Sequence, residues 1–236
     1  MNKQNVAIWL YGSYARGCED QYSDYDILAV CDHPVSLNKN ELPILIPEEK
    51  ISLTYYTWTE IKGMASYGSL FLHHLSCEAK IIYESEEVEG RLSAILNKLC
   101  FYKKASKDIR AFFTVLNDIE EAIKYDYSIS YELSVIGTVL RHSCILGCYI
   151  GGFQKFGRSE PVEIFVKQWG LDHAIAQDFN KLYCFRLHSQ RENCAIPLVN
   201  SDYLLLWCAR VKSILKIIKE QVDIYERDMF ATNYSS

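Results

Sequence analysis

The stretch that most constrains this chain is residues 10–30, LYGSYARGCEDQYSDYDILAV, in which a glycine-serine turn separates two apolar segments. Residues 6–10 form an apolar run and residues 23–30 end on one, so both are predicted to be β-strands. Gly12 interrupts the first run, and Gly17 is suited to end a short helical turn before the second. The sequence therefore predicts a strand, a tight loop and a second strand.

Two aspartates that open the second predicted strand indicate metal chemistry. Residues two apart in a strand share a face, so Asp24 and Asp26 direct both carboxylates to one place. Two like charges at so short a distance repel each other, unless one carboxylate takes a proton or a cation lies between them. A hard divalent ion with oxygen ligands, above all Mg²⁺, suits that place. We therefore expect Asp24 and Asp26 to be metal ligands and catalytic residues.

The loop before them is suited to an anion. Gly12 allows the backbone to approach an anion closely, and Ser13 adds a hydroxyl, while the N–H groups of the following turn are further donors. Phosphate donors at the end of one strand and metal ligands on its neighbour serve metal-assisted phosphoryl or nucleotidyl transfer. An ordinary β-turn-β with a solvated acidic end is the alternative interpretation.

Residues 12–17 (GSYARG), five further residues and residues 23–26 (SDYD) resemble the signature of the DNA polymerase β-like nucleotidyltransferases. Small members of that superfamily carry GS-x-A-R-G, a short spacer, and SD-x-D before apolar residues. The resemblance implies a transferase that moves an NMP from an NTP, with ATP as the first candidate, to an acceptor hydroxyl on a small molecule, a protein or a nucleotide. It implies Mg²⁺ as cofactor, as one ion or two. The nucleotide contacts that it implies are Gly12, Ser13, Arg16 and Ser23.

One position departs from the family pattern. Residues 50–56 (KISLTYY) are predicted to be a strand, with Ile51 and Leu53 on one face and Ser52 and Thr54 on the other. The family presents a third carboxylate between apolar residues on this strand, and Ser52 stands there in this chain. A third carboxylate helps to hold the metal and to activate the attacking hydroxyl. The alternative function is therefore a catalytically weak or inactive nucleotide-binding module of a regulatory or antitoxin-like kind.

The net charge limits the binding partners that we expect for this protein, and the use of cysteine indicates the cellular compartment. The net charge is −5, which argues against a nonspecific grip on a long nucleic acid, because that needs a basic face. The nine cysteines show no CxxC pair and no disulfide-like spacing, and this usage fits a reducing cytosol. A membrane span needs about 20 apolar residues, and the uninterrupted apolar runs here are short. We expect a cytoplasmic protein that binds no membrane, and we leave a homo-oligomer or a protein partner open.

The remainder of residues 1–88 is expected to complete a small nucleotidyltransferase-type mixed sheet with helices. The predicted elements are an edge strand at residues 42–46, helices at 59–67 and 69–75, and a last strand at 80–83. Thr59 is the expected N-cap of the first helix. His73 and His74 diverge by about 100° on the second helix, so we expect one to contact the core and the other to be exposed. The acidic segment 84–89 is interpreted as a linker that ends the first domain.

Residues 89–236 are predicted to form an all-α helical bundle, which makes the whole chain α+β. The predicted helices cover residues 92–102, 106–125, 131–150, 161–169, 172–187 and 201–225. By helix number and order this half resembles the helical partner domains of such nucleotidyltransferases, including the HEPN type. HEPN ribonucleases carry an Arg, four to six residues and then a His, and no such pair occurs in this sequence.

Two cations in the predicted bundle are candidates for the nucleotide site. Lys155 and Arg158 lie in a loop between predicted helices, from which they could reach a triphosphate. A solvated turn is an equal alternative for this loop. Because ligand sites favour domain interfaces, we expect the nucleotide to lie between the two domains.

Overall fold

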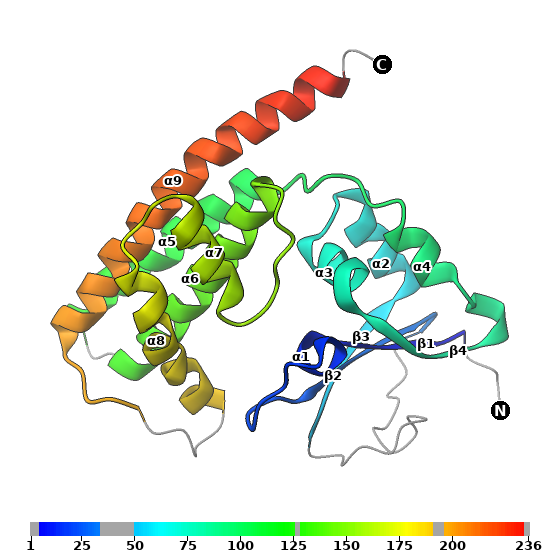
Figure 1. Cartoon of the computed structure of the whole chain (residues 1–236), viewed down its shortest axis with the longest axis horizontal. Coiled ribbons are helices and arrows are strands. Elements are labelled where there is room, and N and C mark those ends of the chain that lie inside the picture. Colours follow the sequence, from blue (N-terminus) through cyan, green and yellow to red (C-terminus); the bar gives the residue numbers. More distant parts are fainter. Residues whose placement is uncertain (1–4, 34–49, 126–127, 191–195, 234–236) are drawn as a thin grey trace. The chain divides into compact units, whose positions relative to one another are not determined.

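The computed structural model describes residues 5–33, 50–125, 128–190 and 196–233, and a four-stranded mixed sheet with the order β3-β2-β1-β4 organises its N-terminal part (Figure 1). The strands are β1 (Ala7–Tyr11), β2 (Tyr25–Cys31), β3 (Ile51–Thr57) and β4 (Lys80–Glu84). β1 pairs antiparallel with β2 and β4, whereas β2 and β3 are parallel. The predicted strands at 6–10, 23–30, 50–56 and 80–83 are confirmed with slightly shifted ends. The predicted edge strand at residues 42–46 lies outside the described residues.

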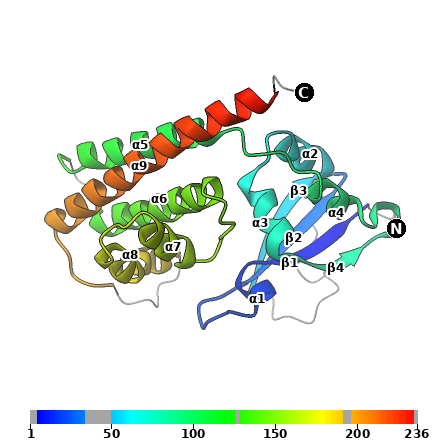
Figure 2. The same cartoon turned by 45° about the horizontal axis from the view of Figure 1, so that its top comes forward.

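Three helices cover one face of this sheet (Figure 2): α2 (Trp58–Ser66), α3 (Leu70–Glu78) and α4 (Arg91–Leu96). Alternate strand residues, such as Trp9 of β1 and Leu28 of β2, form the sheet side of this core. The opposite face carries the smaller cluster of Ile8, Ile27 and Ile51. Because residues two apart in a strand share a face, Tyr11, Asp26 and Ser52 belong to the face that the helices cover.

The beginning of α2 differs from the expectation by two residues. Thr57, and not Thr59, is the N-cap, because its side chain accepts a hydrogen bond from the Glu60 N–H at 3.1 Å. The Glu60 carboxylate in turn accepts from the Thr57 N–H at 2.7 Å, which completes a capping box. This reciprocal pair of hydrogen bonds fixes the residue at which β3 ends and α2 begins.

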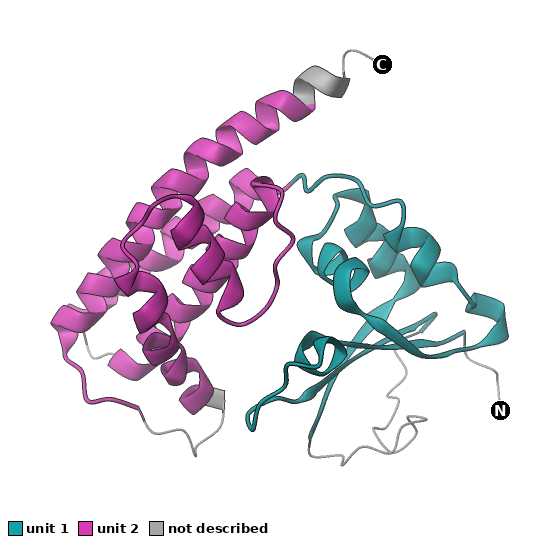
Figure 3. Cartoon of the chain, in the orientation of Figure 1, with its two compact units in different colours: residues 1–103 teal, residues 104–236 magenta. Residues whose placement is uncertain are grey.

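The acidic segment after β4 is part of the first core and not a linker. It contains a 3₁₀ turn, η3 (Glu86–Val88), in which Val88 is 2% exposed and packs with Leu92 and Leu96 of α4 against the sheet. The contacts therefore divide the chain into Met1–Lys103 and Lys104–Ser236 (Figure 3), later than the expected boundary at residue 88. The predicted helix at 92–102 is correspondingly shorter and ends at Leu96.

The second unit is a helical bundle over its described residues, as predicted. Its helices are α5 (Ala105–Ala122), α6 (Ile129–Ile150), α7 (Glu160–Gln168), α8 (Ala174–Gln190) and α9 (Ser201–Asn233). α6 packs against α7, α8 and α9, and α5 runs beside α9 (Figure 1). The central place predicted for α6 is confirmed by buried residues around its circumference, among them Leu133, Ile136 and Leu140.

α6 is the one helix in the described ranges that is long and apolar enough to cross a membrane. Of its most apolar window, 72% is buried inside the protein. The central helix of a bundle passes the same test of length and composition, and the burial of α6 fits that role.

Candidate functional site

The Gly12 loop and the Asp26 carboxylate meet at the end of β1. Gly12 follows the last residue of β1 and begins the short helix α1 (Gly12–Arg16) with a φ of +77°. A Cβ built on Gly12 would lie 2.2 Å from Asp26 Oδ2. Tyr11 is the register partner of Asp26 across the β1–β2 ladder. Glycine is therefore required at position 12 both by its backbone conformation and by the carboxylate beside it.

Asp26 is a partly buried carboxylate with a second carboxylate near it. Burial and the charge of Asp24 raise the pKa of Asp26 from 3.8 to about 6, although the charges of His74 and Arg16 oppose the rise. Asp24 lies immediately before β2, which begins at Tyr25. A cation between the two carboxylates would relieve the repulsion that raises this pKa. The two aspartates that the sequence predicts to act together are thus electrostatically coupled.

The donor set at this edge fits a hard divalent cation. Carboxylate oxygens are the ligands that Mg²⁺ prefers, and Asp24 and Asp26 supply them. In the part of the chain that the structure describes, no group of three or more His, Cys, Asp or Glu side chains is arranged to hold a metal ion. Asp24 and Asp26 are therefore the residues that would hold one.

Ser52 lies beside Asp26 in the sheet. The parallel β2–β3 ladder pairs Asp26 with Ser52 and Leu28 with Thr54, so these side chains share a face. Farther along that face, the Tyr11 hydroxyl lies 3.3 Å from Thr54 Oγ1 and bridges across β2. The residue that faces the same way as Asp26 on the neighbouring strand is thus a serine, and its place at the third-carboxylate position stays a prediction.

A partly buried glutamate that sequence reasoning missed lies against the Gly12 loop. Glu78, the last residue of α3, has a side chain that is 8% exposed. Its Oε1 accepts a hydrogen bond from the Gly12 N–H at 2.9 Å and contacts His74 Nε2, and its Oε2 accepts from Arg16 Nη1 at 2.5 Å. The N–H of Gly12, which is one of the expected nucleotide contacts, therefore has an acceptor inside the fold. The available signal was the spacing of His74 and Glu78, which are four apart on one helix.

The expectation that one of the two adjacent histidines is exposed is wrong. The His74 side chain is 16% exposed because it packs between Glu78 and the Tyr11 ring, whose centroid is 5.8 Å away. His73 is also buried, with Nε2 3.2 Å from the Cys100 carbonyl oxygen. α3 is enclosed on both of these faces, so both imidazoles are inside the first unit.

The other predicted residues of the signature have partners within the loop. The Ser13 carbonyl accepts the Cys18 N–H at 3.1 Å, which closes the short helix before Gly17. Arg16 Nε lies 3.4 Å from Cys18 Sγ. The Ser23 hydroxyl donates to Asp20 Oδ1 at 2.9 Å and accepts from the Asp20 N–H at the same distance. Ser23 thus folds the connection into β2.

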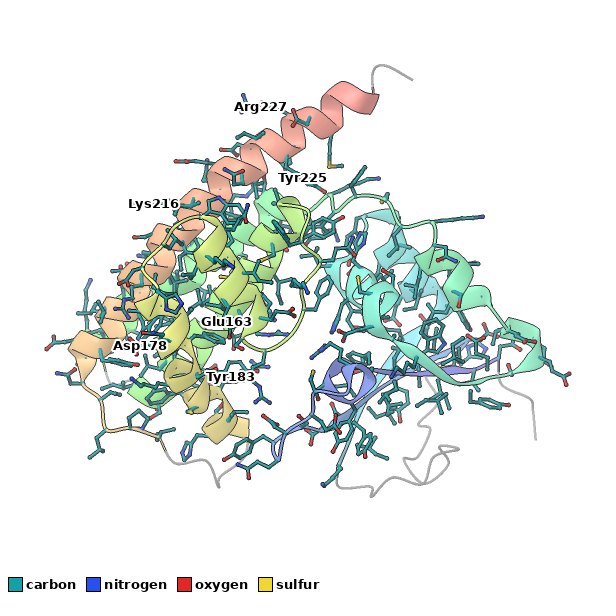
Figure 4. All side chains as sticks on the ribbon, viewed as in Figure 1. Glu163, Asp178, Tyr183, Lys216, Tyr225 and Arg227 are labelled. Atoms are coloured by element: carbon teal, nitrogen blue, oxygen red, sulfur yellow. The ribbon has the colours of Figure 1, made fainter. Side chains whose placement is uncertain are left out.

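Lys155 and Arg158 lie in the second unit, and the structure shows each with a contact there. Lys155 Nζ donates to Glu160 Oε1 at 2.8 Å. Arg158 Cζ lies 5.6 Å from the ring centroid of Tyr183, which comes from α8 (Figure 4). Their contact with a nucleotide stays a prediction.

Comparison with known proteins agrees with the geometry. Residues 1–117 match the family described as "Nucleotidyltransferase domain". The match covers the whole sheet, the Gly12 loop, Asp24, Asp26 and Glu78, and it extends into α5. No curated protein sequence matches this chain.

Proposed function

Because residues 1–117 of this chain belong to the DNA polymerase β-like nucleotidyltransferase domain family, we propose that the protein transfers an NMP from an NTP to an acceptor hydroxyl with Mg²⁺. The family implies a nucleoside triphosphate as substrate and, as a rule, dependence on a metal. The observation that carries the proposal is the contact of Gly12 with Asp26, which brings the loop and the carboxylate pair to one edge of the sheet.

Each residue has a role that follows from its chemistry. Asp24 and Asp26 would hold Mg²⁺, which when bound offsets the negative charge of the triphosphate. The Ser13 hydroxyl and the Arg16 guanidinium orient the phosphates. The acceptor hydroxyl loses its proton to solvent, its oxygen attacks the α-phosphorus and forms a bond to it, and the bond to pyrophosphate breaks. ATP is the first nucleotide to test, and the acceptor is a small molecule, a protein or another nucleotide.

A second candidate function is nucleotide binding with little or no turnover. The register of Asp26 with Ser52 favours it, because a serine hydroxyl neither adds a negative charge to a metal site nor takes the acceptor's proton at neutral pH. A chain of this kind would act as a regulatory or antitoxin-like module that responds to nucleotide.

Labelled nucleotides separate the two functions. The full chain is incubated with Mg²⁺ and each of the four NTPs labelled at the α-phosphate, with and without candidate acceptors. Pyrophosphate release and label transfer that disappear in Asp24→Asn and Asp26→Asn support transfer. Mg²⁺-dependent NTP binding without pyrophosphate release supports the second function.

Asp32→Asn is the matched control, because Asp32 follows the opposite end of β2 and bonds Asn5 Nδ2 at 2.5 Å. It should bind NTP like the wild type. Unchanged NTP affinity in both Asp24→Asn and Asp26→Asn contradicts the metal-ligand assignment, and a wild-type chain that binds no NTP contradicts both functions.

We further propose a reducing, cytoplasmic location. The cysteines among the described residues are free thiols, and four of them, Cys31, Cys144, Cys148 and Cys208, are buried. Free buried thiols suit a compartment in which disulfides do not form. Immunodetection of the native protein in the membrane or secreted fraction, and not in the cytosolic fraction, would contradict this location.

A further inference from the structure

We propose that Glu78 is a positioning residue that fixes the Gly12 loop and aims the Arg16 side chain at the phosphates of the nucleotide. Its effect on nucleotide binding rests on the proposed function, whereas its hold on the loop does not. Glu78 lies on α3, far along the chain from the glycine-serine signature and outside it.

Glu78 joins three separate pieces of the site. It receives the backbone N–H of Gly12, the Nη1 of Arg16 and a contact from His74 one turn earlier on its own helix. The carboxylate is thereby shared between the first residue of α1, the last residue of α1 and α3. One side chain therefore restrains both ends of α1.

The restraint is a charged one. Burial opposes the ionisation of Glu78, but the hydrogen bonds and charges of His74 and Arg16 outweigh it and lower its pKa. Hydrogen bonds to an ionised acceptor are roughly twice as strong as neutral ones. Loss of the carboxylate would leave two donors without this acceptor: the N–H of Gly12, which is a buried residue, and the Arg16 guanidinium, whose side chain is 26% exposed.

The geometry favours positioning over competition with the nucleotide. A phosphate that displaced Glu78 from Gly12 and Arg16 would leave a buried carboxylate beside the incoming negative charge. Arg16 need not release Glu78 to bind an anion. A guanidinium has five N–H donors, and among the described residues Arg16 uses its Nη1 for Glu78 and its Nε for Cys18. The Ser13 hydroxyl and Arg16 Nη2 are the donors that this arrangement directs to phosphate.

Three variants and a matched control test the role. Glu78→Ala removes the carboxylate, Glu78→Gln keeps an oxygen for the Gly12 N–H but loses the charge, and Arg16→Ala removes the partner. Glu84→Ala is the control, because Glu84 also bridges a side-chain donor, Trp9 Nε1 at 3.0 Å, and a backbone N–H, that of Gly90 at 2.8 Å. Glu84 pairs with Ala7, at the end of β1 opposite to Gly12.

Nucleotide titration of the full chain gives the first readout. Glu78→Ala should weaken Mg²⁺-dependent NTP binding roughly tenfold or more, and NMP binding less, because Arg16 is directed at the phosphate chain. Glu84→Ala should bind NTP like the wild type at equal folded fraction. The double variant Arg16→Ala with Glu78→Ala should lose less NTP affinity than the sum of the two single losses, because part of the effect of Glu78 acts through Arg16.

Hydrogen exchange of the Gly12 amide, measured by NMR without nucleotide, gives the second readout. Exchange should be slow in the wild type and in Glu84→Ala and fast in Glu78→Ala. If Glu78→Ala does not fold, Glu78→Gln is tested in its place. It should bind NTP more weakly because the charge is lost, and its Gly12 amide should still exchange slowly because the amide oxygen can accept the Gly12 N–H.

Several results would overturn the proposal. Tighter NTP binding in Glu78→Ala would mean that the carboxylate competes with phosphate. Unchanged NTP binding, or losses in Arg16→Ala and Glu78→Ala that add, would make Glu78 a stabilising residue only. A wild-type chain that binds no NTP overturns the proposed function, and unchanged Gly12 exchange in Glu78→Ala separately overturns the hold of Glu78 on the loop.

Discussion

Replacing Gly12 by alanine should disturb Asp26 directly, and the structure allows the size of the effect to be divided into two parts. A residue with a Cβ at a φ of +77° costs about 1–2 kcal/mol. The Cβ would also lie 2.2 Å from Asp26 Oδ2, so the carboxylate has to leave its position, at a cost of about 0.5–1.5 kcal/mol for an off-rotamer side chain. Gly12→Ala should therefore lose roughly 1.5–3.5 kcal/mol of unfolding free energy.

Gly17→Ala isolates the first part, the backbone cost. Gly17 has a φ of +68° and nothing within 4 Å of a built Cβ, so alanine there meets the backbone cost alone. The difference of about 1 kcal/mol between the variants corresponds to about 4–8 °C in the Tm of a domain of this size.

Thermal unfolding and Mg²⁺-dependent NTP titration of both variants are the assays. Both should be less stable than the wild type, and only Gly12→Ala should also lose NTP affinity, because it alone moves Asp26, the proposed metal ligand. Equal NTP affinity in the two variants would refute the reasoning that the Gly12 contact places Asp26.

Three further changes test other parts of the site. Asp26 has a pKa of about 6 in the folded chain, against an ordinary value of 3.8, so the folded state binds a proton more tightly than the unfolded chain does. The free energy of unfolding gains from this proton in full below about pH 4, and the gain is lost as the pH rises through about 6. Urea unfolding should therefore show Asp26→Asn to be more stable than the wild type at pH 7, with a smaller gap at pH 4; a gap independent of pH would contradict this. Ser52→Asp should raise pyrophosphate release above the wild-type rate, because the new carboxylate lies beside Asp26 and can take the acceptor's proton; brisk wild-type release that neither Ser52→Asp nor the control Ser52→Ala changes would place the third carboxylate elsewhere. Replacing Lys155 and Arg158 together by alanine should weaken NTP binding more than NMP binding. The control is Lys219→Ala, which breaks an exposed ion pair with Asp223 in the same unit. Equal loss of affinity for both nucleotides, or no loss, would make the loop a solvated turn.

The local part of the site could be predicted from the sequence because its determinants are close together in the chain. The Gly12 turn and the strand that carries Asp26 are set by a few neighbouring residues, and strand periodicity was enough to put Ser52 on one face of its strand. The structure adds the parallel register that pairs Ser52 with Asp26. Register between strands that are distant in sequence depends on packing across the sheet, which periodicity alone does not report.

The parts that sequence reasoning missed depend on long-range contacts or on a competing signal. Glu78 is 66 residues from Gly12, and a glutamate at a helix end is ordinarily solvent-exposed. Val88 lies within an acidic run that suggests a linker, although its side chain packs into the core of the first unit. The Thr57 and Glu60 pair that begins α2 was readable as a capping box, but the aromatic residues before it made the strand signal the stronger one.

The central claim is that Asp24 and Asp26, beside the Gly12 loop, form a metal and nucleotide site. A crystal structure of the full chain with Mg²⁺ and a non-hydrolysable NTP analogue tests it most directly. We predict carboxylate oxygens of Asp24 and Asp26 within about 2.0–2.1 Å of the ion, with the triphosphate on Ser13 and Arg16. An ion that neither aspartate ligates, or a triphosphate bound away from the Gly12 loop, would contradict the claim.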